Sequence, residues 1–247
     1  MRYMGGKHRQ AKRIVECLPA GDVYVEPFLG GASVAALAAP LFPKAILADY
    51  NADLVALWQG AVSGEWAPQS EPLTPEQYAH LKAGGGSAAD RAFAATCMSF
   101  GGKWFGGYAC PIRNRTDYQG QGVRGIARKA AQLREASDLT IVHSDYESMR
   151  AIGPGTVVYC DPPYADTVGY AGASKDTFDS ERFWSTAAMW ADSGASVYVS
   201  EYIAPSGWEV VAEMSRQGTL KQKHGESDRV TEKLYTRSQP TNKEMEV

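Results

Sequence analysis

The sequence predicts an α/β fold with a mostly parallel sheet that is interrupted by a helical insert. Three observations carry this prediction. Strand and helix patterns alternate up to residue 62 and again after residue 138, whereas the stretch between them shows helix patterns only. Residues 91–137 carry a net charge of +6, although the chain as a whole is at −3, so the rest of the chain carries −9.

Composition narrows the class of protein. The 247 residues are 44% apolar and 21% charged, which excludes a disordered or collagen-like chain and suits one domain with a smaller subdomain. No apolar run is long enough to span a bilayer, and no apolar stretch follows the basic start, so we expect neither a membrane segment nor a signal peptide. Four widely spaced cysteines with no C-x-x-C pair predict no zinc site and a location in a reducing cytoplasm.

The alternating elements define the predicted catalytic domain, residues 1–62 and 138–247. In the first part we expect helices over residues 7–18, 32–41 and 53–62, and strands over residues 23–25 and 45–48. In the second part, β-branched runs predict strands over residues 140–142, 156–159 and 196–199, with a helix over residues 180–192. Strands that alternate with helices favour parallel pairing.

The predicted insert spans residues 63–137. We expect helices over residues 74–83, 88–100 and 126–136, and a long glycine-rich loop over residues 101–125. Basic and aromatic side chains are interleaved here, which is the composition of a nucleic-acid surface, although a solvated basic subdomain would look the same. Our candidate DNA contacts are Lys103, Trp104, Arg113, Arg115, Arg124 and Arg128.

The strongest motif is Asp161-Pro162-Pro163-Tyr164, directly after an apolar strand. Ligands bind at the carboxyl ends of strands in parallel sheets, and two prolines restrict the backbone of this turn. A carboxylate, a carbonyl and an aromatic face held together suit a flat ring that bears an exocyclic amine. The motif therefore predicts stacking on Tyr164 and acceptance of the amine hydrogens by Asp161 and the Pro162 carbonyl.

A weaker motif is the glycine turn that follows the first strand, Glu26-Pro27-Phe28-Leu29-Gly30-Gly31. Glycines let a backbone approach a ligand closely. The next strand ends at Asp49, where an acid is well placed to accept hydrogen bonds from ribose hydroxyls. The pair indicates a nucleoside-containing cofactor. Asp49 could instead cap the helix that begins near Ala52, and both roles are compatible.

Together these residues resemble the Dam-type DNA adenine N6-methyltransferase family. The segments that carry the likeness are Tyr3-Met4-Gly5-Gly6-Lys7, the glycine turn, the strand end around Asp49, and the tetrapeptide from Asp161 to Tyr164. Their order, with an insert between cofactor turn and tetrapeptide, is similar to the group whose target recognition domain lies at that place. Tyr3 stands where Trp is common, and Ala32 where a glycine often follows.

The resemblance implies a Rossmann-like S-adenosylmethionine-dependent methyltransferase sheet with a helical target-recognition insert. It implies the catalytic residues Asp161, Pro162, Pro163 and Tyr164. The cofactor-binding residues that it implies are Tyr3, Gly6, Lys7, Glu26, Phe28, Gly30, Asp49 and Asp161. The cofactor would be S-adenosyl-L-methionine and the partner double-stranded DNA, with no metal and no membrane. The oligomeric state stays open, with a monomer as a plausible state, and the expected location is the cytoplasm of a bacterial cell or of a phage-infected host.

The expected reaction is methyl transfer to the exocyclic amine of an adenine flipped out of duplex DNA, as in restriction-modification systems. Similar tetrapeptides also serve cytosine N4, RNA and protein-glutamine methylation, and a catalytically silent module that holds cofactor and DNA is a further alternative. The glycine pattern disfavours a nucleotide-dependent oxidoreductase. Of the remaining features, we expect Asp145 to be a helix cap and residues 166–179 to be either a lid or an ordinary loop. Lys221, Lys223, Arg229 and Lys233 form either a basic hairpin or a solvated edge.

Overall fold

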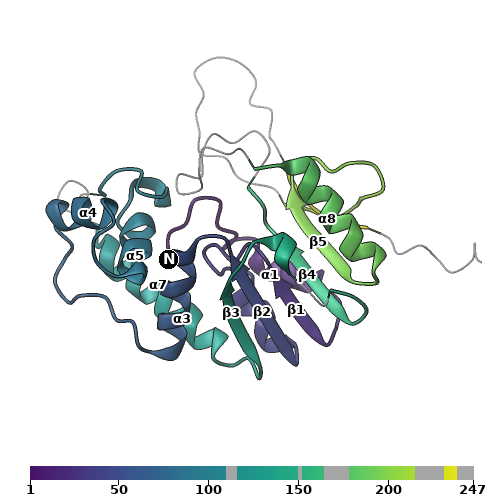
Figure 1. Cartoon of the computed structure of the whole chain (residues 1–247), viewed down its shortest axis with the longest axis horizontal. Coiled ribbons are helices and arrows are strands. Elements are labelled where there is room, and N and C mark those ends of the chain that lie inside the picture. The colour runs from purple at the N-terminus through teal and green to yellow at the C-terminus, as the bar shows by residue number, and fades with distance from the viewer. Residues whose placement is uncertain (110–115, 150–151, 164–177, 215–230, 238–247) are drawn as a thin grey trace, which may run out of the picture.

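The computed structural model describes residues 1–109, 116–149, 152–163, 178–214 and 231–237, and it is built around a seven-stranded sheet (Figure 1). The strands are β1 (Val23–Glu26), β2 (Lys44–Asp49), β3 (Leu139–His143), β4 (Thr156–Cys160), β5 (Ser196–Glu201), β6 (Glu209–Met214) and β7 (Glu232–Thr236). Their order is β3-β2-β1-β4-β5-β7-β6. The first five strands pair in parallel, and β7 is antiparallel to both β5 and β6. The predicted α/β fold with a mostly parallel sheet is therefore confirmed.

The chain changes its direction of travel across the sheet beside β1. It passes from β1 to β2 and β3 on one side, then returns to β4 and β5 on the other, so that β1 pairs with both β2 and β4. This order over the first five strands is that of doubly wound Rossmann-like sheets, in which ligands bind beyond the carboxyl ends of the strands at such a point. The topology thus places a site at the ends of β1, β2 and β4.

Helices cover both faces of the sheet and make up the insert. They are α1 (Ala11–Glu16), α2 (Ala35–Ala38), α3 (Ala52–Ser63), α4 (Pro75–Lys82), α5 (Ala88–Cys97), α7 (Tyr118–Leu133) and α8 (Ser180–Asp192), with short 3-10 turns η1 (Ala39–Leu41), η2 (Phe100–Gly102) and η3 (Tyr146–Ser148). Successive residues of β1 point to opposite faces, so Tyr24 packs in the core with α1, α2, α3 and α7, and Val25 in the core with α8. Figure 1 shows α4, α5 and α7 gathered beside α3 and away from α8.

Local sequence explains where α3 and the insert helices α4 and α5 begin. The Asn51 side chain accepts hydrogen bonds from two backbone N–H groups in the first turn of α3, and Gly64, with φ of +84°, ends that helix. A reciprocal capping box between Thr74 and Gln77 starts α4. Ser87 accepts from a first-turn N–H of α5. Each cap satisfies a donor that has no partner within its helix, so the boundaries are fixed by short polar residues.

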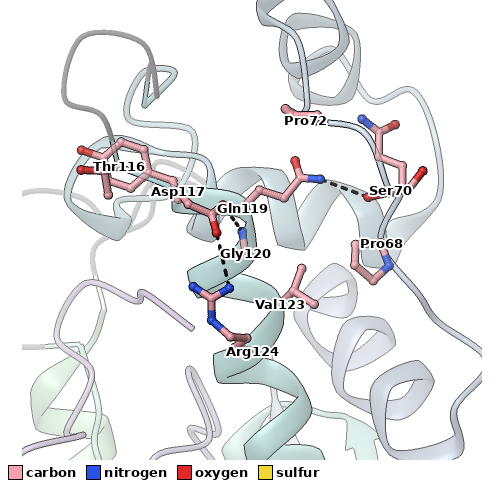
Figure 2. Close-up of a pocket in the computed structure, with 11 residues that line it drawn as sticks. Pro68, Ser70, Pro72, Thr116, Asp117, Gln119, Gly120, Val123 and Arg124 are labelled. Atoms are coloured by element: carbon pink, nitrogen blue, oxygen red, sulfur yellow. Dashed lines mark hydrogen bonds and ion pairs between the residues drawn. The ribbon is translucent and has the colours of Figure 1, made fainter.

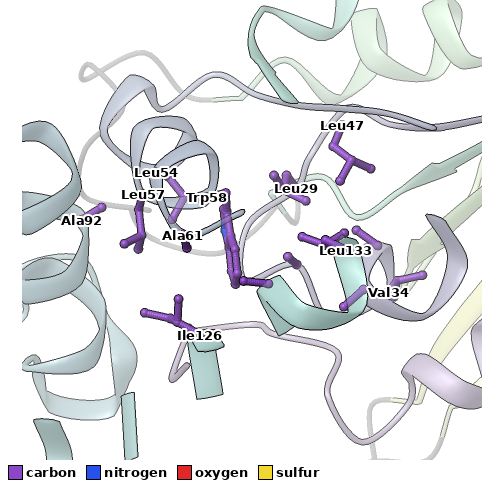
Figure 3. Close-up of a cluster of buried hydrophobic side chains, with 14 of the residues drawn as sticks. Leu29, Val34, Leu47, Leu54, Leu57, Trp58, Ala61, Ala92, Ile126 and Leu133 are labelled. Atoms are coloured by element: carbon purple, nitrogen blue, oxygen red, sulfur yellow. The ribbon is translucent and has the colours of Figure 1, made fainter. Parts of the chain in front are cut away.

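One buried cluster joins the sheet to the insert (Figure 3). Leu29 follows β1, Leu47 lies in β2, Trp58 in α3, and Ile126 and Leu133 in α7, and each is 2% exposed or less. Burying one such side chain stabilises the fold by about 1.5–3 kcal/mol. Helix α7 is therefore packed firmly against the part of the chain that follows β1. The division into residues 1–62 with 138–247 and residues 63–137 stays a prediction.

The start of α7 differs from the sequence-based expectation. The predicted loop over residues 101–125 is wrong from Tyr118 onward, because helix begins there and runs through three glycines. Asp117 accepts from the Gly120 N–H and caps the helix. A Cβ atom at Gly122 would lie 2.7 Å from the Cβ of Cys97, so this glycine lets α7 approach α5 closely. Gly122 allows close packing of the two helices. The sequence-based prediction missed this role, because glycine is more often found in loops.

The antiparallel strands β6 and β7 were not predicted. Three residues of β6 in succession are exposed, and β7 begins with two charged residues, so neither shows the usual alternation clearly. Lys233 lies in β7, whereas Lys221, Lys223 and Arg229 lie outside the described residues. Within the described part of the chain, no helix has both the length and the apolar character needed to cross a membrane.

Candidate active site

Three strands deliver carboxylates to the same edge of the sheet. Glu26 is the last residue of β1, Asp49 is the last residue of β2, and Asp161 directly follows β4. All three strands run parallel, so their ends lie at the sheet edge where the topology places a ligand site. The structure thereby brings together the two motifs that the sequence singled out.

Asp161 is held by a buried lysine. The Nζ atom of Lys7 lies 2.5 Å from Oδ1 of Asp161 and also donates to the Gly5 carbonyl oxygen at 3.2 Å. The Lys7 side chain is 2% exposed and that of Asp161 is 21% exposed. A lysine this deeply buried needs an anionic partner, because the desolvation of its charge is costly. The Tyr3–Lys7 segment is therefore a direct support of the predicted catalytic carboxylate, with Lys7 lying 154 residues away from it in sequence.

The same ammonium has a second carboxylate partner that sequence reasoning missed. Glu232, the first residue of β7, is fully buried, and its Oε1 atom lies 3.0 Å from Lys7 Nζ. Its other oxygen accepts from Gln10 at 3.3 Å. One signal was available: Glu232 precedes the buried Leu234 by two residues, so it occupies a core-facing position of a strand.

The glycine turn is built around Tyr3. A Cβ atom at Gly30, where φ is +48°, would lie 3.0 Å from the Tyr3 ring, and a Cβ atom at Gly31 would lie equally close to Tyr3 Cβ. Glycine is therefore required by both conformation and space at Gly30. Ala32 also has a positive φ of +50°, which explains why a glycine is expected there. Tyr3, Gly6 and the turn lie together, as the predicted cofactor pocket requires.

Asp49 fastens this turn. Its Oδ2 atom accepts from the Gly30 N–H at 2.8 Å and its Oδ1 atom from the Asn51 N–H at 2.9 Å. The helix-cap alternative for Asp49 is wrong, because Asn51 caps α3 and the Asp49 bonds lie outside that cap. Burial raises the pKa of Asp49, and its two backbone hydrogen bonds oppose that rise. An ionised carboxylate has about four acceptor sites, so capacity remains for ribose hydroxyls.

Glu26 is a buried carboxylate beside the turn. It is 2% exposed, and its Oε2 atom accepts from the Tyr24 hydroxyl at 2.5 Å. Burial raises the pKa of Glu26 to about 8, the Tyr24 hydrogen bond opposes this rise, and the charge of Asp161 adds to it. A carboxyl group poised near neutrality can become a charged partner when a cation binds beside it. The sulfonium and ammonium groups of S-adenosylmethionine are such cations, so the residues present fit this cofactor.

Helix α7 contributes a lysine to the same turn. Lys129 is 5% exposed, and its Nζ atom donates to the Gly31 carbonyl oxygen at 2.5 Å and to Ser33 Oγ at 2.8 Å. Burial lowers the pKa of Lys129 to about 8, with Arg128 adding to the decrease and Glu26 opposing it. The insert is thus tied directly to the predicted cofactor pocket.

An aromatic cluster packs around Phe28 of the glycine turn. Phe28 packs against Tyr146 and Phe183, with ring centroids 5.4 and 5.5 Å apart. Asp145 caps η3 by accepting from the Glu147 N–H, so the expected cap is confirmed. Phe28 is therefore placed in the turn by ring packing, while its contact with a cofactor stays a prediction.

The basic residues of the insert fall into two groups. Arg91 pairs with Asp53 at 2.5 Å, Arg134 donates to the backbone carbonyls of Ala61 and Val62, and Lys129 is buried as described. These three cations support the fold. The predicted contacts Lys103, Arg124 and Arg128 are exposed, and Trp104 is half-buried against Phe105. Tyr164, Arg113 and Arg115 lie outside the described residues.

Two cavities flank α7, and Asp161 lines neither of them. A cavity of about 690 Å³ lies between residues 68–72 and the start of α7, and Figure 2 shows the residues that line it. Gln119 ties its walls together, since it donates to the carbonyl oxygens of Gln69 and Glu71 and accepts from the Leu73 N–H. A second cavity of about 410 Å³ is lined by Met1, Arg2, Gln121, Arg124, Gly125 and Arg128. The Arg2 guanidinium lies 4.4 Å from the centre of the Tyr118 ring, which holds the N-terminal segment against the insert.

The comparison with family models bears on the N-terminal third of the chain. The sequence model of the D12 class N6 adenine-specific DNA methyltransferase family matches residues 3–80. A comparison with curated proteins found no match. The matched region holds Tyr3, Lys7, Gly30 and Asp49, which meet at the edge of the sheet.

Solved structures with a similar chain path share 9–13% sequence identity with this one. They include a conserved hypothetical protein from Streptococcus pyogenes (13% identity, 94% of this chain and 95% of that chain covered, TM-score 0.40). Magnesium protoporphyrin IX methyltransferase from Synechocystis, with bound S-adenosylmethionine, is 9% identical (94% and 79% covered, TM-score 0.39). Precorrin-6y C5,15-methyltransferase from Geobacter metallireducens is 10% identical (94% and 87% covered, TM-score 0.35).

The family match bears out the resemblance drawn from the glycine turn and its neighbours, and with it the expected cofactor. The chain is an S-adenosylmethionine-dependent methyltransferase whose residues 3–80 match the D12 class of N6 adenine-specific DNA methyltransferases.

Proposed function

We propose that the protein is a site-specific DNA adenine N6-methyltransferase that acts on an adenine flipped out of double-stranded DNA. The observation that carries this proposal is the placement of Asp161. It follows β4 at the switch point of the sheet, precedes two prolines, and is hydrogen-bonded to the buried Lys7. This carboxylate lies at the same sheet edge as the glycine turn, as methyl transfer from cofactor to amine requires.

The exocyclic amine of adenine is a weak nucleophile, because its lone pair is delocalised into the ring. Asp161 and the Pro162 carbonyl would each accept one of its hydrogens and so localise the lone pair on nitrogen. A carboxylate has about four acceptor sites, so Asp161 can hold the amine while Lys7 remains bound. The nitrogen lone pair then forms the new bond to the methyl carbon as the carbon–sulfur bond breaks and its electrons return to sulfur. The nitrogen becomes acidic, and its proton passes to Asp161 or to water.

S-adenosylmethionine supplies the electrophilic methyl group when it is bound. We assign its ribose to Asp49 and its positive charges to Glu26 and Asp161, because these carboxylates end adjacent parallel strands. Tyr3 and Gly30 would form the wall of this pocket, where a side chain larger than glycine has no room. Much of the rate gain would come from holding amine and methyl group in line.

DNA would be held by the insert. Arg124 and Arg128 are exposed on α7, and phosphate contacts by such residues supply most of the affinity for a nucleic acid. Extrusion of the adenine costs a few kcal/mol. Stacking on Tyr164 would offset part of this cost, at about 1–3 kcal/mol per base.

The test is transfer of a tritiated methyl group from S-adenosylmethionine to unmethylated genomic DNA, followed by digestion to nucleosides. We expect the label in N6-methyldeoxyadenosine, and sequence mapping of the modified sites would give the recognition sequence. Label in N4-methylcytosine, in RNA or in protein alone would contradict the proposal.

A matched pair of variants isolates the carboxylate. Asp161→Asn keeps the shape of the side chain but changes its acceptor capacity, and we expect turnover to be lost. Asp138→Asn is the control, since Asp138 precedes β3 at the opposite edge of the sheet, with 58% of its side chain exposed, and pairs there with Lys44. Retained turnover in Asp161→Asn would reject the role given to Asp161. Binding of both cofactor and DNA without turnover in the unaltered protein would favour a catalytically silent module instead.

A further inference from the structure

Within the described part of the chain, the Lys7 ammonium faces the carboxylate of Asp161 in the tetrapeptide and that of Glu232 outside it. Asp161 lies 2.5 Å away and Glu232 lies 3.0 Å away. Glu232 is more deeply buried than Asp161, with a side chain that is 0% exposed against 21%. A buried carboxylate without a counter-ion is strongly destabilising, so the ion pair between Glu232 and Lys7 is needed to keep Glu232 buried.

The electrostatic consequence concerns Asp161. If Lys7 paired with Asp161 alone, its positive charge would offset most of the negative charge of that carboxylate. Asp161 would then be a weaker hydrogen-bond acceptor. Here the single positive charge is shared, and the three groups together carry a net charge of −1. Asp161 therefore keeps negative charge for a further donor, while Lys7 still fixes its position.

We propose that Glu232 is a positioning residue for methyl transfer, which holds Lys7 under Asp161 and shares its charge so that Asp161 can accept the hydrogen of the target amine. This inference rests on the proposed function. The antiparallel strand β7 would then contribute to catalysis, because its pairing with β5 brings Glu232 to the carboxyl ends of the parallel strands.

The surroundings of Asp161 agree with a surplus of negative charge. Glu201, at the end of β5, is 6% exposed, and its carboxylate accepts from the Tyr202 N–H at 2.8 Å. Burial raises the pKa of Glu201 to about 7, and the charges of Asp161 and Glu232 add to this rise, whereas the Tyr202 hydrogen bond and the charge of Lys7 oppose it. Among the described residues, the titratable groups that interact with Asp161 include Lys7, Glu26, Tyr159, Cys160 and Glu201, with Glu232 behind Lys7.

The test is Glu232→Gln, which keeps the size of the side chain and removes its charge. With the competing carboxylate gone, Lys7 binds Asp161 more strongly, so Asp161 becomes both a weaker acceptor and harder to protonate. We expect kcat for DNA methylation to fall by up to about 100-fold, with KM for S-adenosylmethionine changed by less than about threefold. The acid limb of the kcat–pH profile should move to lower pH.

Two further variants control the experiment. Glu213→Gln removes an exposed carboxylate from the neighbouring strand β6, and it should leave both kcat and the acid limb unchanged. Glu232→Asp keeps the charge but draws the carboxylate away from Lys7. It should fold even if Glu232→Gln does not, and its kcat should fall several-fold with the cofactor KM preserved.

The outcomes separate this inference from the function on which it rests. Wild-type kcat and an unmoved acid limb in Glu232→Gln would overturn the inference, as would wild-type kcat in Glu232→Asp. A lower melting temperature with an unmoved acid limb would also overturn it, since that result describes a structural role alone. Retained turnover in Asp161→Asn would instead reject the proposed function, whatever the Glu232 variants show.

Discussion

Glu26 gives the sharpest prediction for stability, because its carboxyl group is buried in the folded protein and solvated in the unfolded chain. The perturbation is Glu26→Gln, which keeps the size of the side chain and its acceptor oxygen for the Tyr24 hydroxyl. Burial raises the pKa of Glu26 from 4.5 to about 8. The folded protein therefore holds a proton that the unfolded chain releases between these two values. The contribution of Glu26 to stability is complete below pH 4.5 and is lost as the pH rises towards 8.

The magnitude follows from the interval between the two pKa values. Each pH unit within that interval lowers the free energy of unfolding by up to about 1.36 kcal/mol. Between pH 5 and pH 7 the wild-type protein should therefore lose about 2–3 kcal/mol through Glu26 alone. The glutamine of the variant does not titrate, so the variant lacks this loss. The difference between variant and wild type should move in favour of the variant by the same amount.

The assay is urea unfolding of both proteins at pH 5, 6, 7 and 8. The comparison cancels the contributions of the other titrating groups, which are common to both proteins. A difference in unfolding free energy that stays constant across this range would refute the assignment of a proton to Glu26. Calorimetry adds an independent check, since binding of the cationic cofactor should release a proton near pH 7 from the wild type and not from the variant.

Three other predictions follow from the site. Gly30→Ala should destabilise the fold by about 1–2 kcal/mol and weaken cofactor binding, because φ is +48° and the new Cβ atom would lie 3.0 Å from the Tyr3 ring. An unchanged melting temperature would contradict this. Arg128→Ala should weaken DNA binding and reduce, by about one, the slope of the logarithm of the binding constant against the logarithm of the salt concentration. The control Arg134→Ala should lower stability and leave this slope unchanged. Equal slopes in all three proteins would show that Arg128 is not part of the DNA interface. Lys129→Met should lower both stability and cofactor affinity, because it leaves the Gly31 carbonyl oxygen without its buried donor. Thermal melting measures the stability, and titration with the cofactor measures the affinity. Wild-type affinity would show that the glycine turn needs no support from α7.

The site was predictable where chemistry is local in sequence. The glycine turn and Asp49 lie within 24 residues of each other, and both lie at the end of a strand with clear apolar character. A parallel sheet then brings such ends to one edge without further information. Asp161 followed from the same rule, because β4 is buried throughout and the tetrapeptide begins where it ends.

The parts that sequence reasoning missed depend on pairing over long distances. Glu232 reaches Lys7 only because β7 adds to β5 in the opposite direction, and nothing in the immediate sequence around Glu232 predicts that partner. The role of Lys129 was equally hidden, since a lysine on a basic helix is usually solvated and this one is buried by the turn it supports. The glycines of α7 suggested a loop, because glycine is common in loops. The close contact with α5 that Gly122 permits is not visible in the sequence of α7 alone.

The positions of these residues in the fold explain why the insert is basic and the rest of the chain is acidic. The carboxylates of Glu26, Asp49, Asp161 and Glu201 lie at the ends of four adjacent parallel strands, with Glu232 behind Lys7. An edge of this kind attracts a cationic cofactor and repels a phosphate backbone. A polyanionic substrate must therefore be drawn in by charge elsewhere, and the exposed cations of α7 stand on the helix whose Lys129 supports the cofactor turn. The acidic edge and the basic insert are thus complementary requirements of one reaction, because its methyl donor is positively charged and its acceptor is a base within a negatively charged polymer.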